Sequence, residues 1–115
     1  MCEPRHPTWF GADADSLLAR WKVARVAADP ARVPEAAEPG GWRDLAYYRL
    51  HGSPRIYYSS YDAAYLDALA ARIESDLAAD RTVWCIFDNT AAGAAAGNAL
   101  GLMERLECRT TGEEE

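Results

Sequence analysis

The feature of the sequence that most constrains the fold is an alternation of segments with the periods of strands and helices. Residues 45–52 divide with a period of two into an apolar face and a face that carries Arg49 and His51, which predicts a strand. Residues 83–87 form a second strand that is apolar on both faces, as expected of a parallel strand buried on both sides. Between them, residues 61–79 follow a Ser-x-x-Asp start signal and repeat apolar side chains at helical spacing. Strand, helix and strand in this order predict parallel pairing through a right-handed crossover, and therefore an α/β layer fold.

Three further segments extend this order. Residues 14–22 are predicted to form a helix with Asp13 as N-cap, and residues 23–28 a strand that ends at the Asp29-Pro30 pair. Residues 30–41 contain three prolines and two glycines, which predicts an irregular connection. A last helix is predicted over residues 92–107, with four side chains facing inward: Ala99, Leu102, Met103 and Leu106.

Length and charge limit the classes of function. The chain has 115 residues, half of them apolar, which is about one domain; we assign it to residues 1–109 and expect residues 110–115 to be a disordered acidic tail. Its 12 basic and 18 acidic residues give a formal charge of −6. Because the neutralisation of phosphates needs a surplus of Lys and Arg, this balance does not favour nucleic acid as a partner.

The sequence also predicts a protein of the cytoplasm that is not held in a membrane. Its first residues contain no apolar signal segment, and the longest apolar run, residues 91–103, is 13 residues long and is interrupted by Asn98. A spanning helix needs about 20 residues. Three scattered cysteines are too few for a disulfide framework and suggest a reducing compartment.

Polar residues gather where the predicted strands end. Asp29, His51 and Asp88 each stand at the end of a strand, at the start of the loop that follows it. In parallel α/β sheets the carboxyl ends of the strands form the edge at which ligands bind. We therefore expect the site at this edge of the sheet.

Three ordered motifs resemble the C-terminal motifs of the YecE-like family, domain of unknown function 72. The resemblance covers residues 3–106, and its motifs are Glu3-Pro4-Arg5-His6-Pro7-Thr8-Trp9, Tyr48-Arg49-Leu50-His51-Gly52, and Phe87-Asp88-Asn89-Thr90 followed by Gly93 and Asn98-Ala99-Leu100. It implies a partial TIM-like β/α barrel with a parallel sheet, in which this chain supplies the final three strands and a stub. Such barrels have about 250 residues. The family has no agreed activity, and it commonly carries Asn at the position of Asp88.

Arg49 and His51 are the candidate catalytic residues. In the implied barrel the apolar face of their strand meets the helices, so that both side chains point into the barrel, with His51 nearest its open end. An inward Arg can hold an anion and an inward His can donate or accept a proton. The alternative is an internal salt bridge together with a hydrogen-bonded core histidine, and the residues alone leave the two interpretations open.

The remaining candidates are ligand-binding residues. Residues 3–9 are by themselves compatible with a plain surface turn, but the resemblance places them across the barrel mouth from His51. One of the two polar residues at 88–89 is expected to serve only as an N-cap or turn former, while the backbone N–H groups of residues 90–93 offer donors to an anion. The full candidate ligand-binding set is Glu3, Arg5, His6, Trp9, Asp88, Asn89 and Asn98.

No cofactor is identified from the sequence. Several carboxylates and both histidines fall near strand ends, but no local spacing of metal ligands is present, so we expect no metal site. The glycine-rich nucleotide motifs and the serine-hydrolase motif are absent. Tyrosines around residues 57–65 could stack on a base or a sugar, but rings with a surface hydroxyl are the commoner case.

Three hypotheses of function follow. The first is a polar pocket at the carboxyl edge that accepts a small anionic ligand. The second is a non-catalytic barrel fragment, which associates with itself or with a missing N-terminal half because edge strands and apolar faces stay uncovered; the chain as it stands favours this one over catalysis. The third, a metal-dependent phosphodiester hydrolase, is an analogy of fold alone.

Overall fold

The computed structural model describes residues 1–114 of the chain, and the side chains of residues 1–107. It confirms the mixed α/β order with three α-helices and a parallel sheet. Along the chain the elements are η1 (Pro7–Phe10), α1 (Ala12–Arg20), β1 (Ala24–Arg25), β2 (Ala27–Asp29), η2 (Pro34–Ala37), β3 (Gly40–Gly41), β4 (Leu45–Leu50), α2 (Ala63–Ala78), β5 (Thr82–Phe87) and α3 (Ala94–Glu114).

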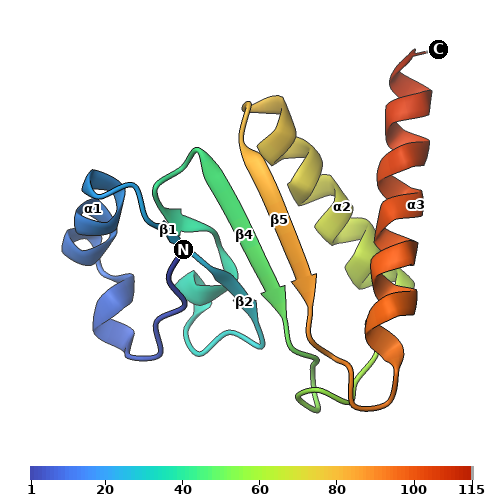
Figure 1. The fold of residues 1–115 in the computed structure, drawn as a ribbon, viewed down its shortest axis with the longest axis horizontal. Helices are drawn as coiled ribbons and strands as arrows, with labels where there is room; N and C mark the ends of the chain where they lie inside the picture. Colours follow the sequence, from blue (N-terminus) through green and yellow to red (C-terminus); the bar gives the residue numbers. More distant parts are fainter. Residues whose placement is uncertain (115) are drawn as a thin grey trace.

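The main sheet has the order β2-β4-β5, and both pairs of strands are parallel, as predicted. Helix α2 makes the crossover from β4 to β5, and Figure 1 shows α2 and α3 on the β5 side of the molecule, with α1 at the opposite end. In the register Ala28 lies opposite Arg49, and Arg49 lies opposite Ile86. These three side chains therefore share one face of the sheet, because neighbouring residues in register point to the same side.

The core lies on the other face of the sheet, under the two long helices. Burial alternates along β4, so that Ala46, Tyr48 and Leu50 are buried and the residues between them are partly exposed. The helices contribute the apolar side chains that pack on this strand: Leu66, Leu69, Ala70, Ile73 and Leu102. The predicted helical repeat of α2 thus forms the main contact between the helix layer and the sheet.

Local polar contacts fix the two ends of α2. Asp62, the last residue of the predicted start signal, is the N-cap, and its Oδ1 accepts a hydrogen bond of 2.8 Å from the backbone N–H of Tyr65. Near the other end, buried Asp76 accepts a hydrogen bond from the Tyr48 hydroxyl and pairs with Arg81 at 2.9 Å. Burial, and then the bond to Asp76, raises the pKa of Tyr48. The helix is therefore anchored to β4 by a polar bond as well as by apolar packing.

One prediction about the sheet is wrong. The apolar strand at 83–87 is covered on one face only, because α2 and α3 both pack on the same side of β5. On the opposite face Trp84 is 55% exposed. No described helix packs against that face along β4 and β5. Among the described residues, Trp84 on this face is therefore not covered by a helix.

Several predicted boundaries also change. Helix α1 begins earlier, with Gly11 at the N-cap position in place of Asp13, and the predicted strand at 23–28 is split at Val26 into β1 and β2. Helix α3 continues past residue 107 to Glu114, so the predicted tail overlaps its end, and Glu115 lies outside the described residues. Met103 is 55% exposed, which corrects its inward placement.

The first residues add a further segment beside β1. The backbone N–H of Cys2 donates to the Ala24 carbonyl and the N–H of Val26 donates to the Cys2 carbonyl, both at 2.8 Å, as a parallel bridge. The irregular connection predicted after Pro30 contains only η2 and the short β3, which pairs antiparallel with β1. Among the described residues no helix is both long and apolar enough to cross a bilayer.

Candidate functional site

Four segments bring polar side chains to the carboxyl edge of the sheet. The ladder of hydrogen bonds continues one residue past the strand ends: the N–H of His51 donates to the Asp29 carbonyl and the N–H of Asp88 donates to the Leu50 carbonyl, both at 2.8 Å. Glu3 directly follows Cys2, which forms a parallel bridge with Arg25 of β1. The position of each polar group is thus fixed by backbone pairing, as the sequence predicted for the carboxyl edge.

Four of these side chains form one charged cluster. Nη2 of Arg49 lies 2.5 Å from Oδ2 of Asp88, and Nη1 lies 3.4 Å from Oε2 of Glu3. His51 is bracketed by the same two carboxylates, with Nε2 at 3.2 Å from Glu3 and Nδ1 at 3.5 Å from Asp88. The hydrogen bond to Asp88, followed by the charge of Glu3, raises the pKa of Arg49. The internal salt bridge that the sequence left open is therefore present, and the guanidinium is engaged by two carboxylates.

The two imidazole nitrogens of His51 are held differently. Nε2 is within hydrogen-bond distance of Glu3, whereas Nδ1 is buried and makes no hydrogen bond. A neutral imidazole has one N–H donor, and only an imidazolium can donate from both nitrogens. Glu3 thus orients the imidazole, and the buried Nδ1 is left without a hydrogen-bond partner among the described residues.

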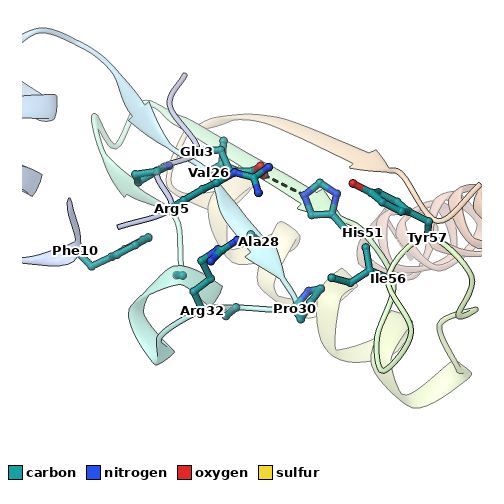
Figure 2. Close-up of a pocket in the computed structure, with 13 residues that line it drawn as sticks. Glu3, Arg5, Phe10, Val26, Ala28, Pro30, Arg32, His51, Ile56 and Tyr57 are labelled. Carbon is teal, nitrogen blue, oxygen red and sulfur yellow. Dashed lines mark hydrogen bonds and ion pairs between the residues drawn. The ribbon is translucent and has the colours of Figure 1, made fainter. Parts of the chain in front are cut away.

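A cavity of about 220 Å³ lies next to this cluster. Figure 2 shows it over the end of β2, between the first residues of the chain, the loop after β2 and the loop after β4. Arg5 and Arg32 line it, and in the described part of the chain neither makes an ion pair or a hydrogen bond. Most of the other lining side chains are apolar or aromatic: Phe10, Val26, Ala28, Pro30, Ile56 and Tyr57.

The loop after β4 holds His51 at the wall of the cavity. Gly52 has a φ of +104°, and a Cβ at this position would lie 3.0 Å from the Arg55 carbonyl oxygen. The N–H of Tyr57 donates to the His51 carbonyl, and the Tyr57 ring lies edge-on to the imidazole with 6.2 Å between the centroids. The turn therefore folds an aromatic ring back onto His51.

A buried tyrosine ties this loop to β2. The Tyr61 hydroxyl donates to Oδ2 of Asp29 at 2.7 Å and accepts from the N–H of Gly52 at 2.9 Å. Burial, together with the bond to Asp29, raises the pKa of Tyr61, so the hydroxyl stays protonated and keeps its donor. Asp29 is thereby engaged in holding the loop.

The structure separates the predicted site residues into two groups. Glu3, Arg5 and His51 line the cavity. Arg49 and Asp88 do not line it, but they contact each other and the Glu3–His51 pair. The other four predicted residues do not line it: His6, Trp9, Asn89 and Asn98. Five of the nine candidate residues are therefore brought together, and the other four have other contacts.

Those other contacts are structural. His6 is the N-cap of η1 and its Nδ1 accepts from the N–H of Thr8, while Trp9 is 40% exposed on the same short helix. Asn89 and Asn98 are buried and joined by a hydrogen bond of 2.7 Å. Asn98 also accepts from the N–H of Tyr61 and donates to its carbonyl, which fixes the start of α2 against α3.

Sequence reasoning missed Arg32, Phe10 and Ile56 as lining residues. Arg32 follows the end of β2 by only a few residues, and this position alone was a usable signal. Nothing in the local sequence marks the other two, because they reach the cavity only through the path of the loops. In the part of the chain that the structure describes, no group of three or more His, Cys, Asp or Glu side chains is placed to hold a metal ion.

Comparisons with known proteins agree with the resemblance found in the motifs. The model of the family described as "Protein of unknown function DUF72" matches residues 1–115. A DUF72 family protein from Thermotoga maritima has a similar fold, with a TM-score of 0.73 and 24% identity over 90% of this chain and 44% of its own. A DUF72 family protein from Enterococcus faecalis also has a TM-score of 0.73, with 19% identity over 91% of this chain and 46% of its own.

The chain thus spans less than half the length of these two solved structures, and at this level of identity they show the fold alone. No curated protein matches it. The family match over the full sequence, with the similar folds, confirms the family that the motifs predicted, and the chain belongs to the DUF72 family.

Proposed function

We propose that this DUF72 chain binds a small anionic ligand in the cavity at the carboxyl edge of its sheet. The observation that carries the proposal is the pair of arginines, Arg5 and Arg32, that line the cavity without an ion pair among the described residues. An unpaired guanidinium offers a fork of N–H donors that fits a carboxylate or a phosphate. The apolar side chains around them favour a ligand that joins its anionic group to an apolar or aromatic part.

We propose that His51 faces the bound anion from the wall of the cavity. Its contact with Glu3 orients the imidazole, and the second carboxylate, Asp88, lies 3.5 Å from its Nδ1. An imidazole at this place can serve as a hydrogen-bond donor or as an acid–base group for the ligand. Arg49 is then a positioning residue, since its guanidinium holds Glu3 and Asp88 around the imidazole.

We also propose that the sheet is the closing arc of a TIM-like β/α barrel. The parallel order β2-β4-β5, the crossover by α2 and the parallel bridge at Cys2 support this interpretation. The relatives of the same fold are more than twice as long as the matched region, which leaves room for further strands in their chains. In such a barrel the proposed ligand would bind at the mouth, where sites of this fold lie.

The experiment is a thermal-shift titration of the full chain with inorganic phosphate, a sugar phosphate and an aromatic carboxylate. A ligand that binds only the folded state raises the melting temperature with concentration. We expect a saturable rise for at least one of these ligands, which Arg32→Ala abolishes. Arg20→Ala is the matched control, because Arg20 is exposed at the end of α1 and does not line the cavity.

Two results of this titration would contradict the proposal. If none of the ligands raises the melting temperature, or if Arg32→Ala and Arg20→Ala respond identically, the cavity is not an anion site. A rise that both variants retain would place the bound anion elsewhere on the chain.

A further inference from the structure

Tyr57 has a backbone conformation that its side chain does not favour. Its φ is +69°, in the left-handed region where glycine is preferred and a bulky side chain is rare. Two other non-glycine residues in the described part of the chain have a positive φ, Lys22 and Asp80. Each stands just after the end of a helix, where a left-handed residue is common. Tyr57 lies in the loop between β4 and α2, so helix termination does not explain its conformation.

The surrounding turn holds Tyr57 in this conformation. The N–H of Tyr58 donates to the Arg55 carbonyl at 3.1 Å, so Tyr57 is the third residue of a four-residue turn. When the third position of a turn has a positive φ, it is usually taken by Gly or Asn. The N–H of Tyr57 donates to the His51 carbonyl, and its carbonyl accepts from the N–H of Ala91 at 2.9 Å. The tyrosine therefore adds strain to a turn whose backbone is fixed on both sides.

Burial of the side chain does not offset this strain. Tyr57 is 51% exposed, and its ring lines the cavity that also contains Arg5 and Arg32. Strained residues that their surroundings hold in place are frequent at ligand sites, where the strain positions a side chain for the ligand. Contact with a ligand thus explains the tyrosine better than the stability of the fold does.

The cavity has room for one ring and an anionic group. Its volume of about 220 Å³ exceeds the roughly 150 Å³ of a cavity that binds benzene and lies below the roughly 300 Å³ at which sites for drug-sized ligands begin. Figure 2 shows Phe10 and Tyr57 at opposite sides of the cavity, with Arg32 between them. The Phe10 ring already lies under the buried guanidinium of Arg25, with 4.9 Å from Cζ to the ring centroid. The half-exposed ring of Tyr57 is therefore the better placed of the two to contact a ligand.

We infer that Tyr57 selects ligands in which a single aromatic ring carries the anionic group, and that this ring packs against the Tyr57 ring. The inference rests on the proposed function, because Arg5 and Arg32 hold the anionic group. Two aromatic rings in contact gain energy beyond the burial of their area, so an aromatic ring should bind more tightly than a saturated ring of similar size. The ligand class is a monocyclic aromatic carboxylate or phosphate.

Calorimetric titration of the full chain with two matched pairs of ligands tests the inference. The pairs are benzoate with cyclohexanecarboxylate, and phenyl phosphate with cyclohexyl phosphate. We expect the aromatic member of at least one pair to bind about three- to tenfold more tightly, the range that contacts between aromatic rings give. The pair that shows this preference identifies the anionic group.

Two variants of Tyr57 separate its ring from its backbone strain. Tyr57→Asn should bring the affinity ratio of the pair close to one, because the ring is lost. It should melt no lower than the wild type, since asparagine tolerates a positive φ. Tyr57→Phe should keep the ratio, because it keeps the ring.

Tyr58→Asn is the matched control. Tyr58 is the neighbouring tyrosine and is 47% exposed, but it does not line the cavity. Its ring lies instead against the guanidinium of Arg55, with 4.0 Å from Cζ to the ring centroid. We expect Tyr58→Asn to keep the preference of the wild type for the aromatic ligand.

Three results would overturn the inference. The first is equal affinity of the wild type for both members of each pair while Arg32→Ala abolishes binding, which leaves the anion site in place and removes only the role of Tyr57. The second is a preference that Tyr57→Asn keeps, or that Tyr57→Phe or Tyr58→Asn loses. The third is a Tyr57→Asn protein that melts well below the wild type, which would assign the tyrosine to the fold. If none of the four ligands binds the wild type, the proposed function fails and the inference fails with it.

Discussion

Nη2 of Arg49 lies 2.5 Å from Oδ2 of Asp88, so the guanidinium at the end of β4 is paired with the carboxylate that follows β5. The same arginine reaches Glu3 from the first residues of the chain. One side chain therefore joins three segments that the sequence separates widely. It also sets where the two carboxylates stand around His51.

Replacement of this arginine should destabilise the fold. In Arg49→Ala two partly buried carboxylates lose their counter-charge, and we expect the free energy of unfolding to fall by about 1 to 2 kcal/mol, between the values for exposed and buried pairs. Urea denaturation measures the change. Arg105→Ala is the control, because its partner Asp67 is 61% exposed and the loss should be smaller. Equal losses in the two variants would show that the cluster adds nothing beyond a surface pair.

The buried amides should act on stability and not on ligand binding. Asn98→Ala removes an acceptor from the N–H of Tyr61 and a partner from Asn89, both of them buried. We expect a loss of about 2 to 3 kcal/mol in the free energy of unfolding, since buried donors are left unsatisfied. Thr90→Ala, at an exposed neighbouring position, should change stability by less than about 0.5 kcal/mol. If Asn98→Ala keeps the stability but abolishes the thermal shift with ligand, Asn98 is a binding residue.

High pH should destabilise the protein in a defined window. Burial raises the pKa of Tyr65 to about 12, from 10.0, and that of Cys85 to about 12, from 9.0. The unfolded chain therefore releases these protons first, so stability is complete below about pH 9 and falls as pH rises toward 12. Each group contributes up to about 1.4 kcal/mol per pH unit within its window.

The test of this prediction is the slope of unfolding free energy against pH. Tyr65→Phe should flatten the slope between pH 10 and 12, because Phe has no proton to release. Tyr58→Phe is the control, since it removes the same hydroxyl from a side chain that is 47% exposed. A slope that Tyr65→Phe leaves unchanged would contradict the role of its burial.

The turn after β4 should require a glycine. Gly52→Ala places a Cβ at a positive φ and within 3.0 Å of a backbone oxygen, and we expect a loss of about 1 to 3 kcal/mol. Gly97→Ala in helix α3 is the opposite case, because a Cβ added there would meet nothing within 4 Å beyond its own stretch of helix, and we expect a gain of about 0.5 to 1 kcal/mol. Thermal unfolding of both variants measures this pair. A stable Gly52→Ala protein would show that the turn tolerates another conformation.

Local pattern was enough to predict most of the elements. The strand β4 and the helix α2 could be predicted because the spacing of apolar residues along the sequence shows which side chains must be buried. The observed boundaries differ from the predicted ones at Gly11 and Glu114, because helix ends depend on caps and tertiary contacts. The parallel order then followed from the connections.

Two placements depend on distant parts of the chain. The sequence of β5 is apolar on both faces, which normally means burial on both, yet Trp84 is exposed. Asn98 was predicted to bind ligand; in the structure it does not line the cavity, and it accepts a hydrogen bond from the N–H of Tyr61 before α2. The type of a residue indicates whether its side chain favours burial or solvent. Which neighbour the side chain contacts depends on how segments far away in the chain are folded. The same limit explains why Phe10 and Ile56 were missed.

The most direct measurement of the central claim is a titration of the ¹⁵N-labelled chain with inorganic phosphate, followed by heteronuclear NMR. If the cavity binds anions, saturable shifts will appear in the backbone amides of residues that line it: Glu3, Arg5, Ala31, Arg32, Ala36, His51, Ile56 and Tyr57. The side-chain Nε–H of Arg32 should shift with them, and Arg32→Ala should remove the whole response. Shifts that never saturate, or that centre on residues of α1 or α3, would contradict the claim.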